Sequence, residues 1–287
     1  MLYKISRGGF TAKMGASEAR REAVAKLLAA DAAGELQAYL LANSGLPGPR
    51  GNLELAQALA DLLARDPPGP EVRAGLQAWR ALSAEEAPTG DPREYLCFCG
   101  TLARGADWVR GRGGRGGHGA REKIARDLRR AAGDPRWRRR EAVAMALQRI
   151  GEADPAALLG VLGAWIADGT WLELRAVAAA LAHPPLLGDR AFALQALALA
   201  ERVLDKAAGA AAATRRTEGY RTLRQGLGYA LSVLAAAEPE EGFALLERWA
   251  ARRDPDLSWV IRENLKKKRL AAHADRVARL KAALGGA

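Results

Sequence analysis

The sequence predicts an all-α fold, an α-solenoid of about six to seven antiparallel helix pairs that forms a single domain over residues 1–287. The first observation is composition: the chain has 64 Ala, 41 Leu and 35 Arg but only 10 Val, 5 Ile and 7 Thr. Ala, Leu and Arg favour helices, whereas β-branched residues furnish strands. The other two observations are apolar residues at helical spacing and a repeated motif. A barrel, a sandwich and a doubly wound sheet are thereby excluded.

Helical segments follow one another between short breaks rich in Gly, Pro and Asp. Ser17 is expected to cap the first helix and Asn52 a later one. In the middle of the chain, Val143, Leu147 and Ile150 share one helix face, which predicts a buried stripe. Besides the helix after Asn52, the expected helices cover residues 18–30, 34–42, 71–82, 92–104, 120–132, 136–150, 155–167, 171–182, 189–208, 215–236, 239–252, 257–268 and 272–284.

A short motif recurs along the chain. Residues 137–141 and 259–263 both read Trp-x-x-Arg-Glu, and each copy follows an Asp-Pro pair. A weaker copy begins at Trp171, with one extra residue before its arginine. Helix pairs that recur at intervals of roughly 30 to 45 residues predict a stack in which each unit buries its apolar stripe against the next.

The run from Asp134 to Leu147 resembles the HEAT repeat, and residues 254–265 are similar with one inserted residue. In that family the Asp caps the second helix of a unit and the Arg bonds to the adjacent unit, forming a ladder. The resemblance implies these roles for Asp134 with Arg140 and for Asp254 with Arg262. Trp137 and Trp259 are expected to pack between repeats, as large repeated rings usually do. Arg139 departs from the aliphatic residue usual in the family.

The formal charge of +11 suits a polyanion, above all nucleic acid, or an acidic protein. The alternative explanation for the many arginines is a GC-rich genome, which raises the arginine content of proteins whatever their function. In a solenoid, equivalent positions align, so basic clusters could form one stripe along a phosphate backbone. The alternative is that these charges are spread over solvated helix faces. The candidate nucleic-acid-binding residues are Arg112, Arg115, Arg138, Arg139, Arg215, Arg216, Arg252, Arg253, Lys266, Lys267, Lys268 and Arg269.

Residues 110–119 are the most biased segment and are expected to form a flexible Gly/Arg-rich loop. Gly111-x-Gly113-x-x-Gly116 spells the dinucleotide fingerprint, but no predicted strand precedes it, which that motif requires. An RGG-like segment that contacts phosphates and bases is one alternative. An inert insertion between repeats is the other.

Nothing in the sequence defines a catalytic group, a cofactor or a metal site. Cys97 and Cys99 lie in an apolar run and are expected to be buried thiols of a reducing compartment. The three histidines, His118, His183 and His273, are isolated. Without a recognisable signal peptide or an apolar run long enough to span a membrane, we expect a cytoplasmic monomer that does not insert into membranes.

These features predict a non-enzymatic repeat protein that offers a basic concave surface to nucleic acid. Two alternatives remain open. The chain resembles the HEAT-like alkylpurine DNA glycosylases in length, basicity, helical content and tryptophans at helix starts. Because it lacks their Trp-Asp-x-x-Asp segment, no catalytic residue is carried over. The other alternative is a scaffold that binds proteins through its groove.

Overall fold

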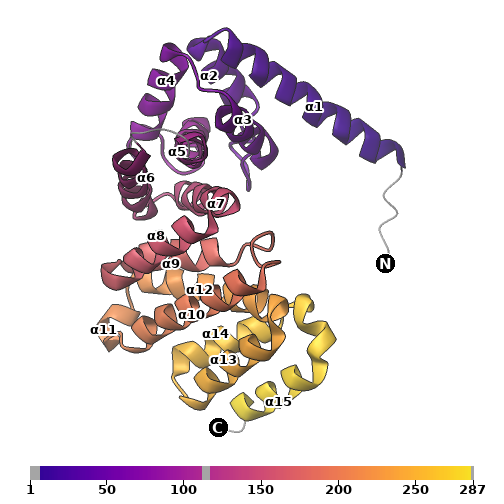
Figure 1. Cartoon of the computed structure of the whole chain (residues 1–287), viewed down its shortest axis with the longest axis vertical. Helices are drawn as coiled ribbons and strands as arrows, with labels where there is room; N and C mark the ends of the chain where they lie inside the picture. Colours follow the sequence, from indigo (N-terminus) through magenta and orange to yellow (C-terminus); the bar gives the residue numbers. More distant parts are fainter. Residues whose placement is uncertain (1–6, 112–116, 286–287) are drawn as a thin grey trace. The chain divides into compact units, whose positions relative to one another are not determined.

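The computed structural model describes residues 7–111 and 117–285, which are helical and contain no strand (Figure 1). The all-α prediction is therefore confirmed. The α-helices are α1 (Arg7–Ala29), α2 (Ala33–Ala42), α3 (Leu53–Arg65), α4 (Pro70–Ala81), α5 (Pro92–Arg110), α6 (Gly117–Ala132), α7 (Trp137–Ala153), α8 (Pro155–Asp168), α9 (Trp171–Leu181), α10 (Arg190–Ala208), α11 (Ala212–Arg215), α12 (Glu218–Ala237), α13 (Pro239–Ala251), α14 (Pro255–Leu265) and α15 (Ala274–Gly285). A 3₁₀ segment, η2 (Lys268–His273), precedes α15. Within the described ranges, no helix is both long and apolar enough to cross a bilayer.

Three local predictions differ from the structure. Ser17 lies inside α1, which begins ten residues earlier at Arg7, so Ser17 caps nothing. The helix expected to reach residue 268 ends at Leu265, where Lys266 leaves the helix. Of the predicted loop at 110–119, Arg110 is the last residue of α5 and residues 117–119 belong to α6. Residues 112–116, and with them Arg112 and Arg115, lie outside the described part of the chain.

The chain divides into two compact units, Met1–Ala146 and Leu147–Ala287. In the first unit α4 runs beside α2, where the Trp79 indole donates to Gln37 at 2.8 Å. On the other side α5 runs beside α3, and the Tyr95 hydroxyl donates to the Asn52 carbonyl at 2.6 Å. The first turns of α7 pack on α5, where Gly105 meets Ala146. Helices of one side are parallel, and each is antiparallel to the helix that follows it.

The second unit has the same two-layer construction. One layer contains α8, α10 and α13, joined by ion pairs such as Glu201–Arg248 at 3.0 Å and Asp205–Arg252 at 3.2 Å. The other layer contains α9, α12 and α14. Trp171 at the start of α9 meets Tyr220 near the start of α12 with 5.3 Å between ring centroids. The helices within a layer again run parallel. Residues near the start of one helix contact residues near the start of the next, and residues near the ends contact each other.

Candidate nucleic-acid interface

The basic run at residues 136–140 is mostly internal. Arg136 is only 2 % exposed, although it sits in the most arginine-rich stretch of the chain. Its guanidinium donates to the carbonyls of Ser83, Leu82 and Ala87 at 2.9, 3.0 and 3.1 Å. It also pairs with Asp134 at 2.8 Å. Arg136 therefore fastens the loop between α4 and α5 to the start of α7.

The two neighbouring candidates, Arg138 and Arg139, are likewise used inside the first unit. Arg138 is 6 % exposed; it pairs with the fully buried Glu94 at 2.9 Å and donates to the Gly48 carbonyl at 2.7 Å. Arg139 pairs with Asp134 at 2.7 Å and donates to the Arg80 carbonyl at 2.8 Å. The prediction of a phosphate-binding role for this run is thus corrected. Its arginines bind backbone carbonyls and carboxylates that the fold brings to them.

The ladder residues have mixed outcomes. Asp254 caps α14, since its carboxylate accepts the amides of Asp256 and Leu257 at 3.0 Å each. Asp134 accepts the Arg136 amide at 2.9 Å, and Arg140 donates to the Asp134 carbonyl at 2.7 Å. Arg262 donates to the Leu284 carbonyl in α15 at 3.1 Å. A ladder between repeats stays a prediction.

The packing prediction for Trp137 is wrong, because 44 % of this residue is exposed. Its ring carries the Arg138 guanidinium 4.4 Å from its centroid. Trp259, the equivalent residue of the second copy, is half-buried and lies against α12. The identical motif letters therefore meet different surroundings in the two units.

Four further candidates surround the N-terminal end of α14. Arg215 pairs with Asp254 at 2.7 Å and with Asp256 at 3.2 Å, and it donates to two carbonyls of the preceding loop. Its neighbour Arg216 is exposed. Arg252 pairs with Asp205 and covers the Trp249 ring at 3.9 Å, and Arg253 is exposed with a φ of 53°.

The last candidate cluster, Lys266–Arg269, lies at the other end of α14, about 16 Å away along an 11-residue helix. Two of its side chains, Lys267 and Arg269, lie beside Tyr229 of α12, a residue that is 52 % exposed. The Arg269 guanidinium lies 4.5 Å from the ring centroid, and it donates to the Tyr229 hydroxyl at 2.7 Å. The Lys267 ammonium lies 5.7 Å from the same centroid. Single-strand binders combine cations that contact phosphates with accessible aromatic rings on which bases stack.

Tyr229 belongs to a wider surface that we call the α12 basic face. Arg221, Gln225 and Tyr229 are all exposed and recur every four residues, so they form one ridge along α12. The complete face comprises Arg175 of α9, then Arg221, Arg224, Gln225 and Tyr229 of α12, then Asp256, Trp259 and Glu263 of α14, and finally Lys266, Lys267 and Arg269.

Glycines let the neighbouring helices approach this ridge. A Cβ at Gly226 would lie 3.3 Å from the Arg175 side chain, and one at Gly228 would lie 3.2 Å from the Trp259 ring. Arg224 covers the same indole at 3.9 Å and pairs with Asp256 at 2.9 Å. The three parallel helices therefore present their side chains as one continuous surface.

A buried asparagine holds α14 in register with α12. Asn264 is fully buried, and its side-chain oxygen accepts the Ser232 amide at 2.7 Å. Its side-chain nitrogen donates to the carbonyls of Leu227 and Val260, both at 2.8 Å. Because a buried amide that is fully hydrogen-bonded tolerates no sliding, Asn264 fixes the position of Lys266–Arg269 beside Tyr229.

The α12 basic face is predominantly positive, with six cations and two carboxylates. The hydrogen bond from Lys266 lowers the pKa of the Glu263 carboxyl, and burial opposes this shift. The nearby charges of Lys267 and Arg224 lower this pKa as well. Glu263 is therefore ionised at neutral pH and orients Lys266 without cancelling the surplus of positive charge.

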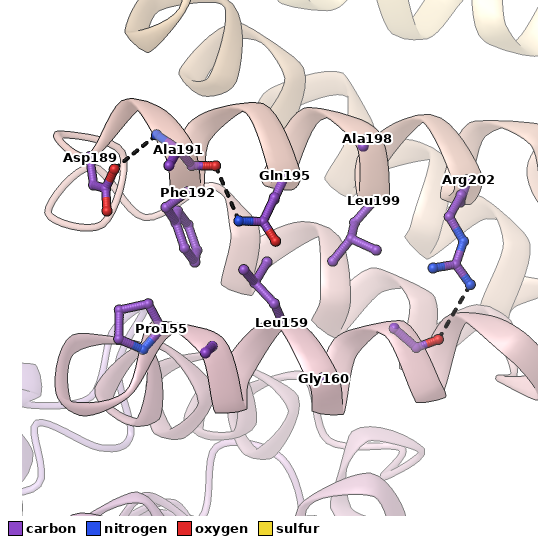
Figure 2. A pocket seen from close by; sticks show the side chains of 12 residues that line it. Pro155, Leu159, Gly160, Asp189, Ala191, Phe192, Gln195, Ala198, Leu199 and Arg202 are labelled. Carbon is purple, nitrogen blue, oxygen red and sulfur yellow. Dashed lines mark hydrogen bonds between the residues drawn. The ribbon is translucent and has the colours of Figure 1, made fainter.

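Figure 2 shows a groove of about 650 Å³ between α8 and α10 of the same unit. Its floor is made of small and apolar residues such as Leu159 and Gly160. Asp189 accepts the Ala191 amide at 2.8 Å, and Arg202 donates to the Gly163 carbonyl at 3.5 Å. Its polar side chains thus serve the helix ends and the interhelical contact.

The sequence reasoning found the Lys266–Arg269 cluster but missed Arg175, Arg221, Arg224 and Tyr229. The repeat of exposed residues at 221, 225 and 229 is a readable signal, because apolar residues occupy the positions that alternate with them around the helix. It did not reveal which helix end would meet Tyr229. Cys97 and Cys99 are free and buried, as expected, and burial raises the pKa of both thiols.

No family model matches this sequence, and searches of curated proteins and of solved structures also give no match.

Proposed function

We propose that this chain is a HEAT-like helical repeat protein that binds nucleic acid through the α12 basic face. The observation that carries the proposal is Tyr229, an exposed ring between Lys267 and Arg269 on a surface with six cations. Positive surfaces that also carry an accessible ring are typical of proteins that bind phosphate backbones and stack on bases.

The layered construction supports the repeat interpretation. Stacked helix pairs place the first helices in one layer and the second helices in another, with parallel helices inside each layer. The parallel helices within each layer of the two units support this interpretation, and the α12 basic face belongs to the layer of α9, α12 and α14. In such arrays one layer forms the extended binding surface.

The proposed mechanism is electrostatic. Arg221, Lys266, Lys267 and Arg269 would neutralise backbone phosphates and release condensed counterions, which makes affinity fall steeply with salt. Tyr229 would add contact with a base or sugar that carries no net charge. Variants that remove a cation should therefore change both the affinity and its salt dependence, whereas a variant of Tyr229 should change the affinity alone.

The first test removes the cluster charges. Lys266, Lys267, Lys268 and Arg269 are all replaced by Gln, and binding to a labelled oligonucleotide is measured by fluorescence anisotropy over a range of salt concentrations. The variant should make about three fewer contacts with phosphates. The slope of log K against log salt should therefore become shallower by about 2 to 3, for single or double strands.

A matched control removes charge from the other layer. Arg190→Gln with Arg248→Gln changes two side chains of that layer, on α10 and α13, which are 72 % and 54 % exposed. This control should bind almost as the unchanged protein does. If both variants lose the same affinity, binding is not specific to the α12 basic face and the proposal is wrong.

A second test separates stacking from charge. Tyr229→Ala should weaken single-strand binding by about 1 to 3 kcal/mol with an unchanged salt slope, whereas Tyr229→Phe should retain most of the affinity. Release of methylated bases from alkylated DNA by the unchanged protein would instead favour the glycosylase alternative. Absence of nucleic-acid binding would favour a protein scaffold.

A further inference from the structure

A separate cavity of about 340 Å³ lies in the first unit, over α5 and between α4 and α6. We call it the α4–α6 pocket. Its wall contains far more positive than negative charge. The charged residues that line it are Arg73, Arg80, Arg104, Arg110, Lys123 and Asp107.

Arg80 is the unusual member of this wall. Its side chain is half-buried, yet its guanidinium donates no hydrogen bond and forms no ion pair with any residue the structure describes. A half-buried guanidinium without a carboxylate partner has donors available for an anionic ligand.

The fold holds Arg80 in this position. The Arg139 guanidinium donates to the Arg80 carbonyl at 2.8 Å. On the opposite side α5 comes so close that a Cβ at Gly100 would lie 3.0 Å from the Arg80 amide. The Arg80 side chain is therefore placed by α5 and α7 and not only by its own helix.

Arg104 adds a second guanidinium to the pocket wall. Its terminal nitrogens pair with Asp107 at 2.6 Å and with Asp127 at 3.0 Å. Its Nε is buried and has no acceptor. The same two carboxylates also serve Arg110 and Lys123, at 2.6 and 3.4 Å, so they do not neutralise the five cations of the wall.

The electrostatics of the pocket favour an anionic ligand. Burial lowers the pKa of the Arg80 guanidinium, and the charges of Arg104 and Arg139 lower it further, against the opposing effect of Asp127 and Asp107. Like charges are thus held together without enough compensation. A bound anion would relieve this repulsion and accept hydrogen bonds from the Arg80 guanidinium.

We propose that the α4–α6 pocket is a binding site for a small phosphate-bearing anion, with Arg80 as its principal ligand and Arg73 and Arg104 beside it. The planar guanidinium fork matches two oxygens of a phosphoryl group, and a volume of about 340 Å³ suits a small ligand. The site lies in the first unit and is independent of the α12 basic face.

The experiment measures thermal unfolding of the full chain in increasing inorganic phosphate, with ionic strength held constant by NaCl. The unchanged protein should show a saturable rise of the midpoint, about 3 to 5 °C at a tenfold excess over Kd. Arg80→Gln should abolish the rise. Because Arg80 has no partner to lose, this variant should keep the unligated midpoint or raise it slightly.

Lys26→Gln is the matched control, since Lys26 belongs to the same unit, is 75 % exposed and, among the described residues, forms its ion pair with Glu22 at 2.8 Å. It should respond to phosphate as the unchanged protein does. An equal response of Arg80→Gln, or a linear response that never saturates, would overturn the proposal. If Arg80→Gln folds poorly, Arg73→Gln replaces it. The proposal is also overturned if phosphate stabilises Arg73→Gln as much as the unchanged protein and calorimetry gives the same phosphate affinity for both.

A final arm identifies the source of the phosphate. In the first outcome, phosphate still stabilises the Lys266–Arg269 variant, and Arg80→Gln leaves the affinity for the oligonucleotide unchanged. This outcome assigns the pocket to a free phosphate or a small phosphate monoester. Competition between phosphate and an oligonucleotide, together with weaker oligonucleotide binding by Arg80→Gln, assigns it to a backbone phosphate. Both outcomes support an anion site, and neither depends on whether the α12 basic face binds nucleic acid.

Discussion

The runs Arg136–Arg140 and Lys266–Arg269 look alike in the sequence but have opposite environments. The first begins α7, and three of its four arginines are at most 7 % exposed. The second follows α14, and Lys266, Lys268 and Arg269 are exposed. The difference lies in what surrounds each helix end. A folded-back loop offers carbonyls to Arg136, whereas an exposed ring, Tyr229, is the neighbour of Arg269.

This difference shows that charge density alone does not identify a binding surface. Arginine can be buried when its five donors find acceptors in a fixed fork geometry, as in the Arg136 cluster. Lysine rarely is, because its compact ammonium is strongly hydrated. A run rich in lysine is therefore a better predictor of an exposed surface than a run of arginines beside an aspartate and a loop.

Arg136→Ala should have the largest effect on stability. It would remove the guanidinium that donates to three loop carbonyls and to Asp134, which would keep its pair with Arg139. Breaking a buried ion pair of this kind costs about 3 to 5 kcal/mol of unfolding free energy. Chemical denaturation of the full chain measures this loss. A loss below about 1 kcal/mol would show that the loop does not depend on Arg136.

Asp134→Asn should have the next largest effect and should alter the pH dependence of stability. Burial raises the pKa of Asp134, but hydrogen bonds from Arg136 and the charge of Arg139 outweigh burial, so the folded-state pKa is lowered. The stabilisation is thus fully present above the unfolded pKa of about 3.9 and disappears as the pH falls through the lower folded-state value.

The variant should lose about 2 kcal/mol at neutral pH and show a flatter decline of stability below about pH 4. Denaturation midpoints over a pH series measure both quantities. Asp275→Asn, at an exposed position of α15, is the control and should leave the acid slope unchanged. Identical slopes for Asp134→Asn and the unchanged protein would contradict the assignment.

Trp137→Ala should have a smaller effect than a tryptophan usually has. Because 44 % of Trp137 is exposed, we expect a loss of about 1 kcal/mol or less, against about 3 to 5 kcal/mol for Trp249→Ala, whose ring is 1 % exposed. The two variants, compared by denaturation, test whether the repeated motif places its tryptophan in the core. A loss at Trp137 equal to that at Trp249 would restore the packing role that the motif predicts.

Much of the helical architecture was predictable, because it follows from local patterns. The Asp254 cap, the break at Pro67 and Pro68 and the stripe around Leu147 depend on residues close in sequence. The environment of Arg136 was not predictable, because its acceptors are backbone carbonyls about fifty residues away. Every residue has such a carbonyl, so the residue type does not reveal which one accepts a hydrogen bond. Asp31 is a similar case. It caps α4 by accepting the amides of Glu71 and Val72 across forty residues.

The same limit explains the candidate site. Lys266–Arg269 was recognisable as a cluster, but its meeting with Tyr229 depends on the parallel register of α12 and α14. Asn264, whose bonds reach Ser232 and Leu227, holds that register. The residues next to Asn264 and Tyr229 in the sequence do not indicate either contact. Sequence patterns therefore predict helices and charge, and long-range hydrogen bonds decide which charges face solvent.

Replacing Lys266, Lys267 and Lys268 together by Gln should have the smallest effect on stability. The three ammonium groups are at the surface, and their known partner is Glu263, which Lys266 contacts from three residues away. Exposed pairs and cations near a helix C-terminus contribute at most a few tenths of a kcal/mol each. The unfolding free energy should therefore change by less than about 1 kcal/mol while oligonucleotide affinity falls. A large loss of stability would mean that this cluster, like Arg136, supports the fold, and the contrast between the two basic runs would disappear.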